Sequence, residues 1–313
     1  MSDIELKKDI DEYLEDVYRS TARRELDRAL SMLDEAYSVD FDREELAGLL
    51  RMLKFWKERW NRMIDFTGPY EKGDYLLKQW DQFTDWSDKI KSVAPERGIQ
   101  SLKYMVHSEA LCCYEQLHLD DNNDLELYLG IGRCNKVLGN YEKAVSILEK
   151  GAKMNRDNSE ILAELADTYA LVDEMQGAKI FFREAFYLNP EQVDLSRLES
   201  GLILKLIEKV IETGIEKEYL SEWLPVYGVI YGVFNIKREM RPIEYGKLKQ
   251  SIFSLQNEIR QNSENGTLVP RLINRYFWLI DHYISTKEDR KTIDEVLMNI
   301  KLLNPSIYRQ YIN

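Results

Sequence analysis

The amino-acid sequence predicts an all-α protein, a right-handed α-solenoid of repeated helix-turn-helix units. Three observations lead to this prediction. Residues 125–192 divide into two consecutive units of about 34 residues, and both units repeat one pattern of large and small apolar residues. No β-type alternation of useful length occurs along the chain. Seven prolines and fifteen glycines also leave few residues for the turns of a β-protein.

The first unit covers residues 125–158 and predicts two helices joined by a tight turn. The residues expected to pack between the helices are Tyr128, Ile131 and Gly132 on the first and Ala144, Leu148 and Gly151 on the second. Gly139 and Asn140 stand between the two helices. Because Gly and Asn adopt positive φ at little steric cost, these two residues favour a turn.

The second unit, residues 159–192, follows the same plan more closely. Its packing residues are Leu165, Ala166 and Tyr169 on the first helix and Ala178, Phe182 and Ala185 on the second. The alanines let two helix backbones approach closely, while the aromatic rings fill the remaining space. Pro190 lacks an amide hydrogen and disfavours helix at Asn189, so it is expected to end the unit.

This order of residues resembles the tetratricopeptide repeat family. The second unit shows the family order as Leu165, Ala166, Tyr169, Ala178, Phe182, Ala185 and Pro190, and the first unit adds Gly139 and Tyr141. The first unit departs from the family at Asn135 in place of Tyr, Gly151 in place of Ala and Arg156 in place of Pro. The resemblance implies stacked helical pairs and a concave binding surface lined by the first helix of each unit.

Weaker copies of the pattern stand at both ends of the chain. Residues 10–43 contain Ala29, Leu33 and Ala36 at the spacing of a second helix, and residues 274–307 show similar offsets. Terminal repeats commonly diverge, because one face meets water. We therefore expect degenerate helical repeats at 1–95, central repeats at 96–192 and a continuous repeat-like region at 193–313. Within the first region, Pro69 is expected to break the helical pattern after a long helix over residues 42–66.

Composition and charge limit the classes of partner. The chain has 313 residues, a net charge of −12 and a sequence pI near 5.0. This charge opposes nonspecific attraction to nucleic acid phosphates or anionic lipid, so neither is an expected partner. No stretch approaches the ~20 consecutive apolar residues that span a bilayer. Residues 1–8 lack the apolar core of a secretory signal, and three cysteines do not form a disulfide framework. A cytoplasmic protein is expected.

Two clusters of polar residues resemble metal sites only superficially. The side chains that could bind zinc are those of His107, Cys112, Cys113, His118 and Cys134. On a helix, however, Cys112 and Cys113 point away from the two histidines. Asp120, Asn122 and Asp124 have the alternate spacing of a calcium loop, yet Leu125 and Ile131 stand where Gly and Glu are needed. We expect buried cysteines, a helix cap at Asp124 and no bound metal.

Catalysis has no support in the sequence. Gly130 and Gly132 form a lone Gly-x-Gly inside a predicted helix, where close helix packing explains Gly132 better than a phosphate site. No Walker sequence, nucleophile elbow or histidine pair of a zinc protease occurs. We expect neither an enzyme nor a cofactor.

By resemblance, the concave surface would bind a partner protein. The residues predicted to line it are Glu126, Leu129, Arg133 and Lys136 from the first unit and Glu160, Ala163, Glu164, Asp167 and Leu171 from the second. Family members that hold a C-terminal carboxylate use Lys and Asn at positions where this chain has Leu129, Arg133, Ala163 and Asp167. The spacing of Glu160, Glu164 and Asp167 predicts an exposed acidic stripe. Such an acidic groove favours a basic or amphipathic helical partner.

A second candidate surface lies on the helix predicted over residues 42–66. Arg51, Lys54, Arg59 and Arg62 share one side, opposite the apolar side. This basic face either binds an acidic partner or a nucleic acid, or it is a solvated surface balanced by Glu58 and Asp65.

The function predicted from the sequence is that of a protein-interaction scaffold or adaptor in a larger assembly. Two alternatives stay open. An RNA-binding helical-repeat protein would need a basic groove with base-reading side chains, and salt-dependent RNA retention would favour it. An enzyme built on the helical array would need convergent polar residues, and an ordered metal or nucleotide would favour it.

Overall fold

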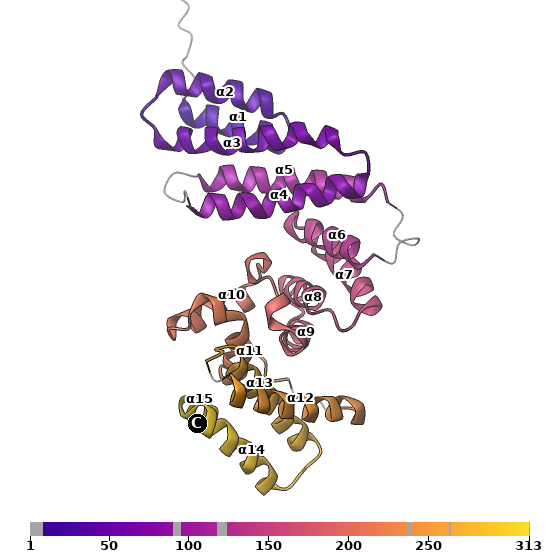
Figure 1. Cartoon of the computed structure of the whole chain (residues 1–313). Coiled ribbons are helices and arrows are strands. Elements are labelled where there is room, and N and C mark those ends of the chain that lie inside the picture. The colour runs from indigo at the N-terminus through magenta and orange to yellow at the C-terminus, as the bar shows by residue number, and fades with distance from the viewer. Residues whose placement is uncertain (1–8, 90–94, 118–123, 237–239, 263, 313) are drawn as a thin grey trace, which may run out of the picture. The chain divides into compact units, whose positions relative to one another are not determined.

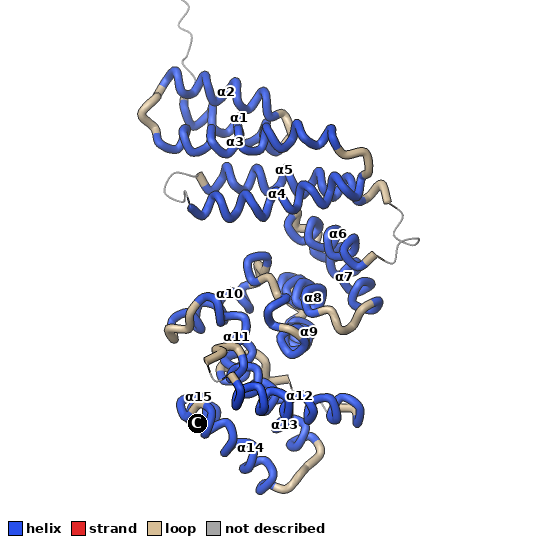
Figure 2. Tube along the Cα trace, in the orientation of Figure 1, coloured by secondary structure: helices blue, strands red, loops and turns tan. Residues whose placement is uncertain are grey.

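The computed structural model describes residues 9–89, 95–117, 124–236, 240–262 and 264–312 (Figure 1). Throughout these ranges the regular elements are helices, and none of the residues forms a β-strand (Figure 2). The predicted all-α helical-repeat class is therefore confirmed. Contacts within the chain define two compact units, residues 1–147 and residues 148–313. From here on, these are the first and the second unit, and the segments 125–158 and 159–192 are called repeats. The finer division at residues 95 and 192 stays a prediction.

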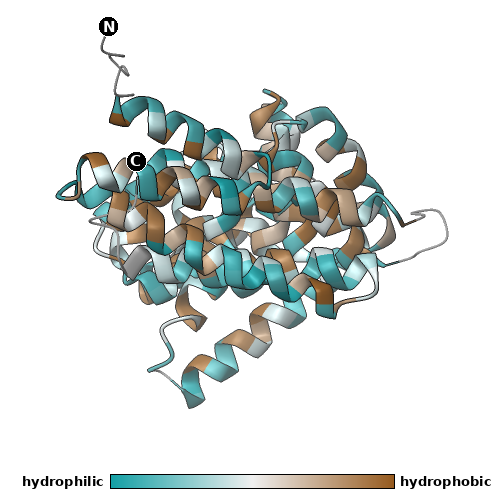
Figure 3. Cartoon of the chain, turned by 90° about the horizontal axis from the view of Figure 1, so that it is seen from above, coloured by the Kyte–Doolittle hydropathy of each residue, from teal (hydrophilic) through white to brown (hydrophobic). Residues whose placement is uncertain are grey.

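The first unit consists of antiparallel and neighbouring amphipathic helices. These are α1 (Ile10–Ala22), α2 (Leu26–Val39), α3 (Glu44–Arg62), α4 (Pro69–Lys89), α5 (Glu96–Tyr114), α6 (Leu125–Val137) and the first half of α7 (Tyr141–Met154). Hydrophilic and hydrophobic residues alternate along the individual helices in Figure 3, as expected for helices that bury one face. Pro69 is the first residue of α4, a position where its missing amide hydrogen costs nothing.

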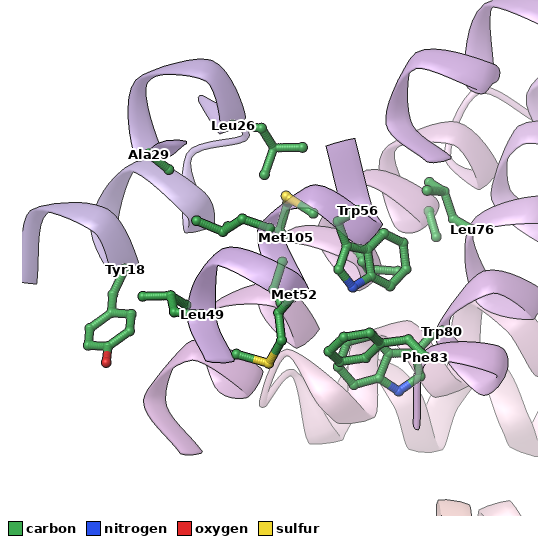
Figure 4. Close-up of a cluster of buried hydrophobic side chains, with 14 of the residues drawn as sticks. Tyr18, Leu26, Ala29, Leu49, Met52, Trp56, Leu76, Trp80, Phe83 and Met105 are labelled. Carbon is green, nitrogen blue, oxygen red and sulfur yellow. The ribbon is translucent and has the colours of Figure 1, made fainter. Parts of the chain in front are cut away.

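A cluster of buried aliphatic and aromatic side chains forms the core of the first unit (Figure 4). Leu49, Met52, Leu53 and Trp56 of α3 follow one another at helical spacing and are all buried. The Trp56 ring lies 6.0 Å from the ring of Trp80 and 5.6 Å from that of Phe83, centre to centre. The packing face predicted near the N-terminus is confirmed, since the three residues Ala29, Leu33 and Ala36 are fully buried.

Tyr114 explains two glycines of the first unit. Its ring lies so close to Gly73 of α4 that a Cβ there would stand 2.6 Å from a ring atom. A Cβ at Gly130 of α6 would stand 2.9 Å from the same ring. Close packing therefore requires Gly130. The same role predicted for Gly132, which is buried, stays a prediction.

Among its described residues, the second unit continues with eight further α-helices. They are α8 (Ser159–Leu171), α9 (Met175–Leu188), α10 (Gly201–Glu212), α11 (Leu220–Ile230), α12 (Pro242–Gln261), α13 (Leu268–Ser285), α14 (Arg290–Leu303) and α15 (Pro305–Ile312). The side chain of Asn158 begins α8 by accepting a hydrogen bond from the Ile161 amide, at 2.9 Å. α9 ends before Asn189, and Pro190 starts a short 3₁₀ turn, as predicted.

The pair α8 and α9 packs in the predicted register. Ala178, Phe182 and Ala185 of α9 have no exposed surface, and Ala166 of α8 is likewise fully buried. Small residues thus stand where the backbones approach, which supports the helix-turn-helix pattern predicted for residues 159–192.

Charged side chains connect α9 and α11 to the central helix α13. Arg183 of α9 forms an ion pair with Asp281 of α13, and both residues are buried. Glu222 of α11 accepts hydrogen bonds from Arg271 of α13. Buried charges need such partners, because an isolated one loses its hydration without compensation. The two pairs therefore fix the position of α13 within the second unit.

Candidate functional site

Asp167, one of the residues predicted to bind a partner, caps a helix. Its carboxylate oxygens accept hydrogen bonds from the amides of Glu199 and Ser200, at 2.9 and 2.8 Å. These amides stand at the beginning of α10, where backbone donors have no partner within the helix. Asp167 is fully buried and serves the fold of the second unit.

The predicted exposed acidic stripe is wrong. Glu160 is half-buried, and only 2% of Glu164 and none of Asp167 is exposed. The reason is that α8 is buried on nearly all sides, so that offsets of three and four residues no longer identify a solvated face. Among the other residues predicted from α8, Ala163 is buried and Leu171 is half-buried.

The residues predicted from the first repeat lie on α6 in the first unit. Glu126 is exposed and Arg133 is half-buried, whereas Leu129 and Lys136 are buried. Lys136 is therefore no free cation for a ligand to reach from solvent. A binding role for this set stays a prediction.

The basic face of α3 is only partly formed. Arg51, Lys54 and Arg62 are exposed. Arg59 turns back onto its own helix: its guanidinium carbon lies 3.3 Å from the centre of the Phe55 ring, and Nη1 donates to the Phe55 carbonyl at 3.1 Å. Burial lowers the pKa of Arg59. The binding role of this face also stays a prediction.

A groove that the sequence did not reveal runs along α9 in the second unit. It consists of two adjoining hollows, each with a volume of about 400 Å³. The side chains that form its apolar floor are Ala152, Leu162, Leu165, Tyr169 and Phe181 in the first hollow and Tyr187, Leu188, Met240 and Trp278 in the second. Arg156 and Glu184 border both hollows, which makes them continuous. We call this surface the α9 groove.

Two aromatic pairs define the floor of the α9 groove. The rings of Tyr169 and Phe181 are stacked with centres 5.7 Å apart. The rings of Tyr187 and Trp278 lie 4.6 Å apart at an angle of 47°. Aromatic side chains packed against each other offer a large apolar area that loses little conformational freedom on binding, which is typical of protein-binding surfaces.

Polar contacts hold this floor in place. The Tyr169 hydroxyl donates a hydrogen bond to Glu149 at 2.6 Å, and burial together with this carboxylate raises the pKa of Tyr169. The guanidinium carbon of Arg275 lies 3.8 Å from the centre of the Tyr187 ring, and that of Arg183 lies 4.5 Å from the Trp278 ring. These contacts restrain the rings of Tyr169, Tyr187 and Trp278 in the unbound chain.

The charges that border the second hollow are balanced. They are the cations Arg156, Arg241 and Lys247 and the carboxylates Asp157, Glu184 and Glu244. Arg241 and Glu244 already form a salt bridge, at 2.9 Å. The groove therefore carries no strong preference for an acidic or a basic partner.

The cysteine and histidine residues singled out in the sequence do not converge within the described ranges. Cys113 and Cys134 are buried, Cys112 is exposed, and all three are free thiols. His107 is buried, with Nδ1 2.8 Å from the Lys103 carbonyl and its ring against Trp80. Among the described residues, no three or more His, Cys, Asp or Glu side chains are grouped so that they could hold a metal ion.

The polar segment before α6 is described only at its end. Asp124 accepts a hydrogen bond from the Glu126 amide at 3.0 Å and so caps α6, as predicted. His118, Asp120 and Asn122 lie outside the described residues. Among the helices in the described ranges, none has both the length and the apolar character needed to cross a membrane.

Paired helices that bury small residues between them, with an open groove along one of them, define a helical-repeat protein. The family model of the tetratricopeptide repeat matches residues 125–158. The match shows at least one tetratricopeptide repeat in the chain, and it coincides with the first predicted repeat, residues 125–158. No curated protein matches this chain.

Proposed function

We propose that this chain is a scaffold or adaptor that holds a segment of a partner protein in the α9 groove. Tetratricopeptide repeats are commonly protein-interaction modules and typically non-catalytic. The observation that carries the proposal is the continuous aromatic floor from Tyr169 to Trp278. Since the bordering charges are balanced, the partner segment is amphipathic and is selected by its apolar side chains. The cytoplasmic setting stays part of the proposal, suggested by three free thiols.

Phe181 and its neighbour Ile180 provide a matched test. Phe181 lines the groove, while the side chain of Ile180 is exposed on α9 and does not line it. Truncating an aromatic anchor at a binding surface typically costs about 2 kcal/mol, or roughly 30-fold in affinity. We therefore expect Phe181→Ala to lose partners that both the wild-type chain and Ile180→Ala retain.

The measurement is affinity purification with quantitative mass spectrometry, followed by titration of the recovered partner. Circular dichroism of each variant establishes that its helices are intact. Recovery of the same partners by all three proteins, with equal affinities, would show that the α9 groove is not the binding surface. Attention would then turn to the α6 residues and to the basic face of α3.

A further inference from the structure

An exposed face of α12 has a composition that the fold of one chain does not explain. Ile243, Gly246, Gln250 and Phe253 follow at intervals of three, four and three residues and therefore share one face of the helix. The exposed fractions of Ile243 and Phe253 are 76% and 65%. The opposite face, with Leu248, Ile252 and Leu255, is buried in the second unit.

Gly246 is the most unusual residue of this face. A Cβ at this position would meet no atom within 4 Å, and its backbone is that of an ordinary helix. Glycine inside a helix destabilises it relative to alanine by increasing the freedom of the unfolded chain. Nothing in the described part of the chain requires the missing side chain. A flat site between two exposed apolar residues is instead typical of a surface on which another helix packs closely.

The face is complementary to itself. We consider two copies of α12 that run antiparallel, with the two-fold axis passing between their Gln250 residues. Phe253 stands three residues after Gln250, and Gly246 stands four residues before it. Because the second copy runs in the opposite direction, its Gly246 comes to nearly the same height as Phe253 of the first copy. Both residues lie on the same edge of the face. The Phe253 ring of each copy is therefore placed over Gly246 of the other, where no side chain obstructs it. A two-fold axis repeats this contact and so doubles the apolar area that it buries.

The charges on the other edge agree with this arrangement. Lys247 and Glu258 lie on that edge, and both are exposed. In the antiparallel pair, Lys247 of one copy stands about five residues, or ~7.5 Å along the axis, from Glu258 of the other. Extended side chains span such a distance. In the single chain, the Glu258 carboxylate accepts a hydrogen bond from the Ser254 hydroxyl at 2.8 Å, and from no other side chain among the described residues.

From these observations we propose that the exposed face of α12 binds a second copy of this chain through an antiparallel α12–α12 contact. The interface goes beyond the proposed function, because it needs no other protein and lies outside the floor of the α9 groove. One helix face on each partner is a small interface, and we expect reversible dimers with Kd on the order of 10 μM.

Sedimentation velocity of the full chain over a range of concentrations tests the proposal. We expect dimers that dissociate on dilution, and a shift of at least tenfold in Kd for Phe253→Lys and for Gly246→Leu. Gly246→Leu is informative because leucine favours helix more than glycine, so a loss of dimer cannot result from a weakened α12. Leu302→Lys on α14 is the control, since Leu302 is 77% exposed and lies elsewhere; its Kd should match the wild type.

A charge exchange tests the register of the pair. Lys247→Glu should weaken the dimer, and adding Glu258→Lys to the same chain should restore it, because the two-fold pair then has the same contacts with reversed signs. A wild-type chain that stays monomeric at 200 times the expected Kd, on the order of millimolar, would overturn the proposal. So would dimers that survive Gly246→Leu, or that weaken equally with Leu302→Lys.

Discussion

The Asp167 carboxylate accepts a hydrogen bond from the Ser200 amide and so joins the middle of α8 to the beginning of α10. A second bond comes from the Glu199 amide. Negative charge at a helix N-terminus also interacts favourably with the helix dipole. The contact makes Asp167 part of the fold, although its residue type and position on a repeat had suggested a ligand-binding side chain.

Replacement of Asp167 should therefore destabilise the second unit. We expect Asp167→Ala to lower the free energy of unfolding by about 1–2 kcal/mol, since two backbone donors lose their acceptor. Urea unfolding followed by circular dichroism measures the change. Glu208→Gln removes an exposed carboxylate from α10 and serves as the control. Equal stability of both variants would contradict a capping role for Asp167.

The ion pair between Arg183 and Asp281 leads to a second prediction. Both residues are buried, so Asp281→Ala leaves an uncompensated positive charge in the second unit. We expect a loss of about 3–5 kcal/mol in unfolding free energy. The double variant Arg183→Met with Asp281→Leu should recover most of it, because neither charge then needs a partner. A double variant as unstable as the single one would show that the packing, and not the charge, determines the loss.

The neighbouring residues Cys112 and Cys113 should react very differently. Burial raises the pKa of Cys113 to about 11, with smaller contributions from the charges of Glu109 and Cys112. At pH 8, about one Cys113 side chain in a thousand is then a thiolate, the reactive form. Cys112 is exposed.

A chromogenic disulfide reagent at pH 8 should thus label one thiol rapidly in the native chain and all three after denaturation. Cys112→Ser should remove the rapid phase. Because the pKa of Cys113 lies above the ordinary value, its labelling rate should continue to rise with pH beyond 9. Rapid labelling of two thiols in the native Cys112→Ser chain would contradict the burial of Cys113 and Cys134.

Local features of the sequence determined the helices and much of their packing. Ala178, Phe182 and Ala185 are buried as their spacing predicts, because helical periodicity places them on one face whatever the rest of the chain does. Asn189 and Pro190 end α9 for an equally local reason, the missing amide hydrogen. Pro69 shows the limit of such reasoning: the same property that breaks a helix also permits it to begin one, at α4.

Tertiary structure alone decided which polar residues are buried and where the groove lies. Periodicity identifies the face of a helix but not how many neighbours cover it, so Glu164 and Asp167 were expected in solvent and are buried. The α9 groove joins Tyr187 to Trp278, which stands on α13 far along the chain. No short-range pattern records that contact. It depends on the packing of whole helices, to which the buried pair of Arg183 and Asp281 contributes.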